Sequence, residues 1–297
     1  MKRVLITGAN SYIGTSFERY AAEHYSSELD VHTIDMVDGS WRQNSFTDAE
    51  GRPYDCIFHV AGIAHADVGH VSPEVKAKYY AINTDLAIEC CEKAKECGCS
   101  QFILMSSMIV YGKQTYITKA TKPHPANFYG DSKWKADKGV RKLKSDDFVV
   151  TVLRPPMIYG KGSKGNYPTL SKLAKKVPIF PDYQNKRSML YIENLCEFLC
   201  QVIIDGRGGV FWPQNGECAS SSEIVREISR VHKHRVITTR LLNLAVEISK
   251  RCPIKKVRDL SSKAFGDSWY ESDMSEYDFD YQKVSLSESI IRTESKN

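Results

Sequence analysis

The sequence has no apolar run long enough to cross a membrane. Its apolar stretches stay well below the ~18 residues that a membrane-spanning helix needs. The stretch that follows Met1, Lys2 and Arg3 is also too short for the apolar core of a secretory signal. We therefore expect no membrane partner and a cytoplasmic location.

Cysteines spaced as in metal sites are also missing. The chain has nine cysteines, an odd number. Those that lie close together, Cys90-Cys91 and Cys97-x-Cys99, do not form C-x-x-C pairs. This usage favours reduced thiols and predicts no bound metal.

The chain lacks a strong excess of one charge and has no repeats or low-complexity tract. Its net charge is +5, and Lys and Arg are scattered along the sequence. In the densest run, residues 133–144, Lys and Arg alternate with apolar residues as on the solvent-exposed face of a helix. We predict no nucleic-acid partner on this basis.

Short apolar runs alternate with helical stretches up to residue 155. The runs lack the in-and-out alternation of half-exposed strands, which is typical of strands buried on both faces. The order strand, helix, strand predicts a Rossmann-type α/β fold with a doubly wound parallel sheet. The predicted strands span 4–6, 31–34, 56–60, 102–105 and 148–153, and the helices 11–25, 73–98 and 127–144.

A glycine-containing turn follows the first predicted strand. Gly8 and Gly14 occupy the outer positions of G-x-x-G-x-x-G, and Ser11 stands in the middle. Such a turn brings the N–H groups of a helix N-terminus to a dinucleotide pyrophosphate. We expect the backbone N–H or hydroxyl of Ser11 to face the phosphates. The residues predicted to line them are Gly8, Asn10, Ser11, Tyr12, Ile13 and Gly14.

Residues at the ends of the next two strands fit a nicotinamide dinucleotide. Asp35 ends the second strand, where a carboxylate accepts hydrogen bonds from a ribose diol and repels a 2′-phosphate, which favours NAD over NADP. The alternative is an ordinary turn or cap Asp. Ala61 and Gly62 end the third strand and leave room for the cofactor.

A tyrosine and a lysine lie one helical turn apart, at Tyr129 and Lys133. An ammonium beside a phenol lowers the tyrosine pKa, which makes Tyr129 a candidate acid/base. Lys133 could also reach the cofactor ribose. Ser106 and Ser107 follow the fourth strand, where a hydroxyl can hold a substrate oxygen or make a local turn bond.

Taken together, these segments resemble the extended short-chain dehydrogenase/reductase family, of the nucleotide-sugar epimerase and dehydratase type. The resemblance covers nearly the whole chain. It implies Ser107, Tyr129 and Lys133 as catalytic residues, Asn83 as a support for the lysine at the cofactor site, NAD as cofactor and a homodimer. The segments that carry it are TGANSYIG, HVAG, YYAINT, SSMIVYG, YGDSK and RPPMIYGKG.

The rhythm of strands and helices changes after Pro156, and further helical stretches are predicted over 191–204 and 221–232. We therefore predict an NAD-binding part over 1–155 and a second, smaller mixed α/β part for substrate binding over 156–297. We expect the chain to cross between the two parts more than once. In the smaller part, Phe180 resembles a platform for uracil, Arg187 a diphosphate ligand and Asn166 a further nucleotide contact. A core phenylalanine, a solvated arginine and a loop asparagine remain the alternatives.

Three departures from the family pattern stand out. Ser11 replaces a glycine. The stretch Ser45-Phe46-Thr47-Asp48 lacks the acid common at its first position, and Pro155-Pro156 occupies a place near which galactose-type epimerases carry an asparagine. The last departure weakens assignment to that particular sugar.

The resemblance implies oxidation and reduction at C4 of a UDP-linked hexose through a 4-keto sugar, as in the family's 4-epimerases, with a place in surface-polysaccharide supply. A rival within the fold is an NAD(P)H-dependent reductase of a 4-keto-6-deoxy nucleotide sugar. A second rival is a non-catalytic nucleotide-sensing protein.

Overall fold

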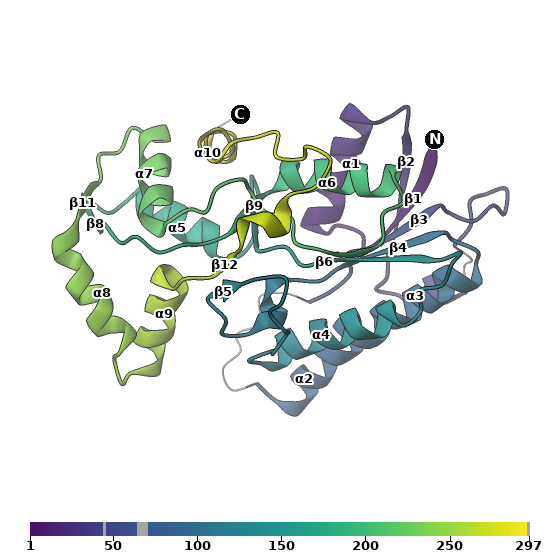
Figure 1. Ribbon diagram of the computed structural model, residues 1–297, viewed down its shortest axis with the longest axis horizontal. Coiled ribbons are helices and arrows are strands. Elements are labelled where there is room, and N and C mark those ends of the chain that lie inside the picture. Colours follow the sequence, from purple (N-terminus) through teal and green to yellow (C-terminus); the bar gives the residue numbers. More distant parts are fainter. Residues whose placement is uncertain (44–45, 64–70, 296–297) are drawn as a thin grey trace.

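A six-stranded, all-parallel sheet forms the centre of the protein in the computed structural model, which describes residues 1–43, 46–63 and 71–295 (Figure 1). The strand order is β10-β6-β4-β3-β1-β2. The chain pairs β1 first with β2 and then with β3 on its other side, so the carboxyl ends of β1 and β3 border the crevice where such sheets bind ligands. The strands are β1 (Lys2–Thr7), β2 (Leu29–Ile34), β3 (Cys56–His59), β4 (Gln101–Met105), β6 (Val149–Leu153) and β10 (Gly209–Phe211).

Helices cover both faces of this sheet, which confirms the predicted doubly wound arrangement (Figure 1). One face carries α1 (Tyr12–His24) and α6 (Ile192–Ile204), which pack on each other. The other carries α3 (Leu86–Glu96) and α4 (Phe128–Arg141), with α2 (Pro73–Tyr80) against α4.

The predicted helix over 73–98 is confirmed over residues 73–96, but it contains a π-helical turn. A π-helical turn, Ala81–Asp85, separates α2 from α3. The turn buries Asn83 and Thr84, and both side chains bond to Ser132 of α4 or its backbone. Polar side chains that must face inward explain why the regular spacing breaks here.

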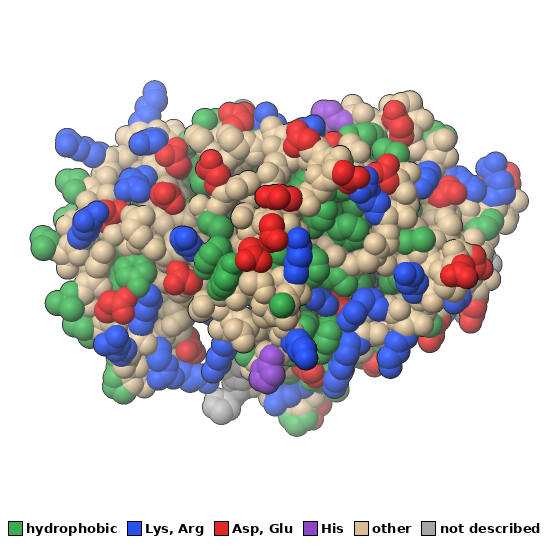
Figure 2. All heavy atoms as spheres, viewed as in Figure 1, with side chains coloured by type: hydrophobic (Ala, Val, Ile, Leu, Met, Phe, Trp, Pro, Cys, Tyr) green, Lys and Arg blue, Asp and Glu red, His purple; other side chains and the backbone are tan. Residues whose placement is uncertain are grey.

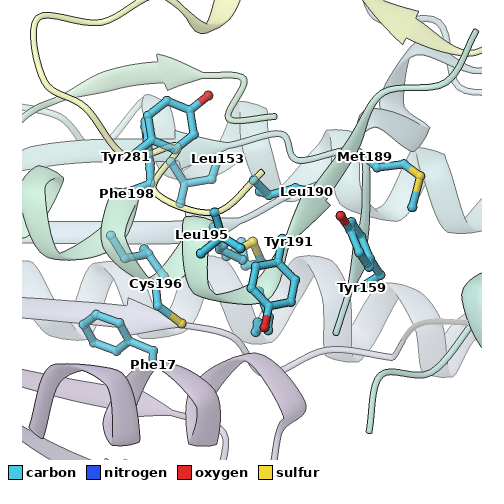
Figure 3. Packing of buried hydrophobic residues seen from close by; sticks show 14 of the residues in the cluster. Phe17, Leu153, Tyr159, Met189, Leu190, Tyr191, Leu195, Cys196, Phe198 and Tyr281 are labelled. Carbon is cyan, nitrogen blue, oxygen red and sulfur yellow. The ribbon is translucent and has the colours of Figure 1, made fainter. Parts of the chain in front are cut away.

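The core fills both sides of the sheet. Phe17 of α1 and Cys196 and Phe198 of α6 are fully enclosed on one side (Figure 3). Leu104 of β4 and Val140 of α4 belong to the cluster on the other side. Strands β3 and β4 are buried along their whole length, which is why their sequences read as continuous apolar runs.

The C-terminal part is built from short helices and three two-stranded parallel ladders. Helices α6 and α7 were predicted from sequence, whereas α5, α8, α9 and α10 were not. The division at residue 155 stays a prediction. The helices are α5 (Asn166–Ala174), α7 (Ser221–Val231), α8 (Asn243–Lys250), α9 (Lys255–Phe265) and α10 (Leu286–Glu294). The ladders pair β5 (Tyr116–Ile117) with β12 (Trp269–Tyr270), β7 (Met157–Tyr159) with β9 (Met189–Tyr191), and β8 (Ile179–Pro181) with β11 (Ile237–Thr239).

Candidate active site

The turn after β1 packs tightly against the end of β3. Gly8 has a φ of +127°, and a Cβ at this position would lie 2.9 Å from the backbone nitrogen of Ala61. Its N–H donates to the carbonyl of Ile34 at the end of β2 (3.0 Å). Asn10 also has a positive φ, of 59°. Only a glycine fits the first position, as expected of a turn that must pass close to both neighbouring strands.

Ser11 is the N-cap of α1. Its hydroxyl accepts the N–H of Gly14 (3.1 Å), and a Cβ on Gly14 would lie 2.5 Å from that oxygen. A serine in place of the family's middle glycine therefore caps the helix. Whether its N–H or hydroxyl also faces phosphates stays a prediction, as do the cofactor contacts of Tyr12 and Ile13.

Asp35 is exposed at the carboxyl end of β2. One carboxylate oxygen accepts the N–H of Val37 (2.9 Å), the turn role that the sequence left open. The same carboxylate has a second oxygen, so the turn bond leaves the predicted ribose contact available.

Asn83 ties the end of β3 to α4. Its Oδ1 accepts the N–H of Ile63 (2.8 Å), and its Nδ2 donates to the carbonyl of Ile63 (3.1 Å) and to the hydroxyl of Ser132 (3.2 Å). A Cβ on Gly62 would meet both Asn83 Oδ1 and Lys133 Nζ at 3.0 Å. The π-helical turn thus brings three predicted cofactor-site residues together.

Lys133 and Tyr129 sit on the first turns of α4. The buried Lys133 donates from Nζ to the carbonyl of Met105 (3.2 Å), and burial lowers the pKa of Lys133 to about 8. The Tyr129 ring packs edge-on against Tyr79, 6.0 Å between centroids. Burial, with Tyr79 as a lesser cause, raises the pKa of Tyr129 to about 12. Lys133 does not lower the pKa of Tyr129 in this arrangement, because its ammonium is bonded to Met105 and burial disfavours the phenolate.

Ser107 follows β4 and is the N-cap of a short 3₁₀ turn, with its hydroxyl accepting the N–H of Ile109 (3.3 Å). It is half-buried. Ser106 is enclosed, and its hydroxyl has no partner within the described part of the chain. Of the two serines, Ser107 is thus the one that could meet a substrate.

The geometry agrees with comparisons to known proteins. The sequence profile of the NAD dependent epimerase/dehydratase family matches residues 4–211. The chain belongs to this family. As a family member it is an enzyme that uses NAD, and its Rossmann-like fold is the one expected.

Individual relatives are more distant. UDP-glucose 4-epimerase of Vibrio cholerae is 28% identical over 247 residues, which covers 77% of this chain and 75% of that protein. The solved UDP-glucose 4-epimerase of Thermus thermophilus, in complex with NAD, superposes with a TM-score of 0.71 at 17% identity, over 98% of this chain and 97% of that one. The dTDP-4-dehydrorhamnose reductase of Bacillus anthracis, in complex with NADP, gives a TM-score of 0.65 at 22% identity, over 82% of this chain and 85% of that one. At these identities the two structures establish the fold alone.

Two groups of this family member were missed by sequence reasoning. His59, at the end of β3, is buried, and its Nδ1 shares a hydrogen bond with the Thr7 hydroxyl (2.7 Å). Burial, followed by the nearby Lys133, lowers the pKa of His59 to about 3, so the ring is neutral at physiological pH. Its only sequence signal was its place in HVAG, directly before the small residues of the crevice.

The second missed group is a buried ion pair that bonds to Tyr111, in the 3₁₀ turn that Ser107 caps. Arg154 donates from Nε and Nη2 to the two carboxylate oxygens of Asp137 (2.8 and 3.1 Å) and from Nη1 to the hydroxyl of Tyr111 (2.8 Å). Tyr111 also accepts the indole N–H of Trp212 (2.7 Å). The pair therefore ties α4 to the turn after Ser107 and to the C-terminal part.

The predicted substrate residues fall into two places. Phe180 and Arg187 both contact the end of α9: the Phe180 ring is 4% exposed and lies 5.7 Å from that of Phe265, and Arg187 donates to the carbonyls of Lys263 and Ala264. Asn166 is exposed at the start of α5. In this structure Phe180 is thus a core residue, the alternative that the sequence left open. That Phe180 stacks on uracil stays a prediction, and it requires that one face of the Phe180 ring becomes accessible.

Over residues 1–43, 46–63 and 71–295, no group of three or more His, Cys, Asp or Glu side chains could hold a metal ion. All nine cysteines are free thiols. No helix in these same ranges is long and apolar enough to cross a membrane.

Proposed function

We propose that this enzyme is an epimerase acting at C4 of a UDP-linked hexose through a transient 4-keto sugar. The observation that supports the proposal is that the ammonium of Lys133, one helical turn after Tyr129, bonds to the last residue of β4, two residues before Ser107. Met105 ends β4, accepts the Lys133 ammonium and is followed two residues later by Ser107. Both side chains thus lie at the carboxyl edge of the sheet.

Tyr129 is the acid/base of the proposed reaction. As phenolate it takes the proton of the C4 hydroxyl, and as phenol it returns a proton to the 4-keto oxygen. The pKa of about 12 must fall before the first of these steps at neutral pH. Lys133, with its pKa of about 8, is mostly cationic at neutral pH and is one helical turn away. Its ammonium would lower the tyrosine pKa when it turns from Met105 toward the phenol.

Ser107 holds the C4 oxygen during the same steps. To do so, its hydroxyl must exchange the 3.3 Å bond from Ile109 for the substrate oxygen, a small change for a freely rotating group. NAD, when bound, supplies a hydride acceptor that returns the hydride to the ring. The residues that would hold it are those of the Gly8 turn together with Asp35, Ala61, Gly62, Asn83 and Lys133.

The nucleotide of the substrate is assigned to the C-terminal part. Arg187 would bind the diphosphate once its guanidinium leaves the two carbonyls at the end of α9, and Asn166 would contact the nucleotide. Phe180 would stack on the uracil only if the ring of Phe265 moves away from it. The proposal has three further parts. We propose a homodimer that forms through the helical stretch at 74–98 and α4, a cytoplasmic location, and a role in the supply of surface polysaccharide.

The rival reaction is reduction of a 4-keto-6-deoxy nucleotide sugar. Pro155 and Pro156, at a place near which galactose-type epimerases carry an asparagine, weaken the assignment to that particular sugar. The carbonyl of Pro155 accepts the N–H of Met108 (2.9 Å), directly beside Ser107, so this departure from the pattern adjoins the candidate site.

Mass spectrometry of the purified protein after denaturation tests the proposal. We expect NAD and a UDP-sugar among the released molecules, and exchange between two C4 epimers when either UDP-hexose is added. Release of NADP with no interconversion of any UDP-hexose, N-acetylated or not, would contradict it. The variant Lys133→Met, which keeps the length of the side chain but loses the charge, is the matched inactive control.

A further inference from the structure

The end of the molecule formed by α8 and α9 exposes apolar side chains that the fold does not use. Eight of the fourteen most exposed large apolar side chains in the described ranges lie in β8, β11 or the segment 240–263. Six of them, between 40% and 88% exposed, are Leu241, Leu244, Ile248, Ile254, Val257 and Leu260.

The spacing of these six residues places them on the outward faces of the two helices. Leu241, Leu244 and Ile248 follow each other by three and four residues, which places them on one face of a helix. The opposite side of α8 carries the buried Val246. Ile254, directly before α9, and Val257 and Leu260 within α9 follow each other at spacings of three.

The two helices meet through small residues. The hydroxyls of Ser249 and Ser261 lie 2.6 Å apart, and Ser261 is the buried residue of α9. The larger apolar side chains are therefore not needed to join α8 to α9. They form an unpartnered apolar surface at the left end of the view in Figure 2, with Lys and Arg side chains beside it.

The same segment carries the net charge of the protein. Residues 240–263 contain seven Lys or Arg and two acidic residues, whereas the rest of the chain has 34 of each. Within the described part of the chain, Lys255, Lys256 and Arg258 have no ion pair. The turn between α8 and α9 joins two short basic runs, Lys250-Arg251 and Lys255-Lys256-Val257-Arg258.

We propose that α8 and α9 form a docking surface for an anionic lipid bilayer, with the six apolar side chains inserted at the headgroup level and the basic side chains among the lipid phosphates. Helices with outward Leu and Ile beside Lys and Arg are typical of interfacial membrane binding. A second copy of the chain is a poorer occupant, because it would bring seven basic residues from each copy face to face. The proposal revises the prediction of no membrane partner and does not rest on the epimerase reaction.

Sedimentation of the full-length protein with vesicles tests the proposal. We expect the protein to pellet with vesicles of phosphatidylcholine and phosphatidylglycerol, to stay in solution with pure phosphatidylcholine, and to be released by salt. Leu244→Ser with Ile248→Ser and Leu260→Ser should lower the bound fraction at least ~10-fold, and so should Lys255→Gln with Lys256→Gln and Arg258→Gln.

The controls separate docking from folding and from general charge. Lys142→Gln with Lys144→Gln removes two exposed charges after α4 and should leave vesicle binding unchanged. All variants should keep NAD binding and the unfolding temperature of the parent. Equal pelleting with and without phosphatidylglycerol, or pelleting that survives both triple variants, would overturn the proposal. So would capture of duplex DNA in place of vesicles, or a dimer that the apolar triple variant dissociates without any vesicle binding.

Discussion

The carboxylate of Asp137 and the guanidinium of Arg154 form a two-point ion pair that is closed off from solvent. Asp137 is fully buried on α4, and Arg154 follows β6 with 5% of its surface exposed. Losing one partner leaves a buried charge uncompensated, which costs more than the pair itself contributes. Arg154 also bonds to Tyr111, at the end of the 3₁₀ turn that Ser107 caps, so loss of the pair bears on both stability and the site.

Asp137→Ala should therefore lower the free energy of unfolding by about 3–5 kcal/mol, as measured by urea denaturation. Replacing both partners, Asp137→Leu with Arg154→Met, should restore most of the loss. Glu23→Ala removes the exposed pair with Arg19 and should change stability by less than ~1 kcal/mol. An Asp137→Ala protein as stable as the Glu23→Ala control would contradict the buried-pair interpretation.

Tyr129→Phe removes the proposed acid/base and keeps the ring against Tyr79. We expect at least a ~100-fold fall in kcat with NAD binding retained, measured by steady-state turnover of the sugar nucleotide that the protein accepts. Tyr79→Phe changes the neighbouring hydroxyl and serves as the control, with most of the activity kept. A Tyr129→Phe protein with parental kcat would remove Tyr129 from the mechanism.

Lys133 should make stability depend on pH. In the unfolded chain the lysine keeps its proton up to pH ~10.5, whereas the folded protein releases it above about pH 8. The unfolded state thus binds more protons between these values, and stability rises with pH across this window. Lys133→Met lacks this titrating group. The free energy of unfolding of the parent, relative to that of Lys133→Met, should therefore rise by roughly 3 kcal/mol from pH 8 to pH 10.5.

Denaturant unfolding at several pH values measures this difference. Lys138→Met, on the same helix, is the matched control. A parent-to-variant difference that stays flat over this range would show that Lys133 is not buried as described.

Asp35 should set the choice of cofactor. Asp35→Ser keeps an oxygen that can accept the N–H of Val37 but removes the charge that repels a 2′-phosphate. The ratio of the Kd for NADP to that for NAD should fall at least ~10-fold, as measured by isothermal titration. Titrations that give the parental ratio would mean that the carboxylate does not face the adenosine ribose.

The sequence was sufficient for five of the six strands of the sheet, all but β10, and for several residues that gather at its edge. Buried strands such as β3 and β4 are continuous apolar runs, and the Gly8 turn, Asn83 and Lys133 follow strands whose carboxyl ends must meet. Local patterns of this kind require no knowledge of distant contacts.

What the sequence could not supply depends on such contacts. The π-helical turn exists because Asn83 bonds to Ile63 and Ser132, which are distant in sequence. The high pKa of Tyr129 follows from burial by packed neighbours. Helices α8 and α9 were missed because their apolar residues face outward, so the usual pattern of a core-facing helix does not describe them.

Nicotinamide absorbance during turnover of a UDP-hexose tests the central claim most directly. If the enzyme is a C4 epimerase, the sugar changes to its epimer with no net change in absorbance from added NADH or NADPH, because the hydride returns to the substrate. No interconversion of any UDP-hexose, together with consumption of one reduced cofactor per molecule of an added 4-keto-6-deoxy nucleotide sugar, would contradict this account and would establish the reductase in its place.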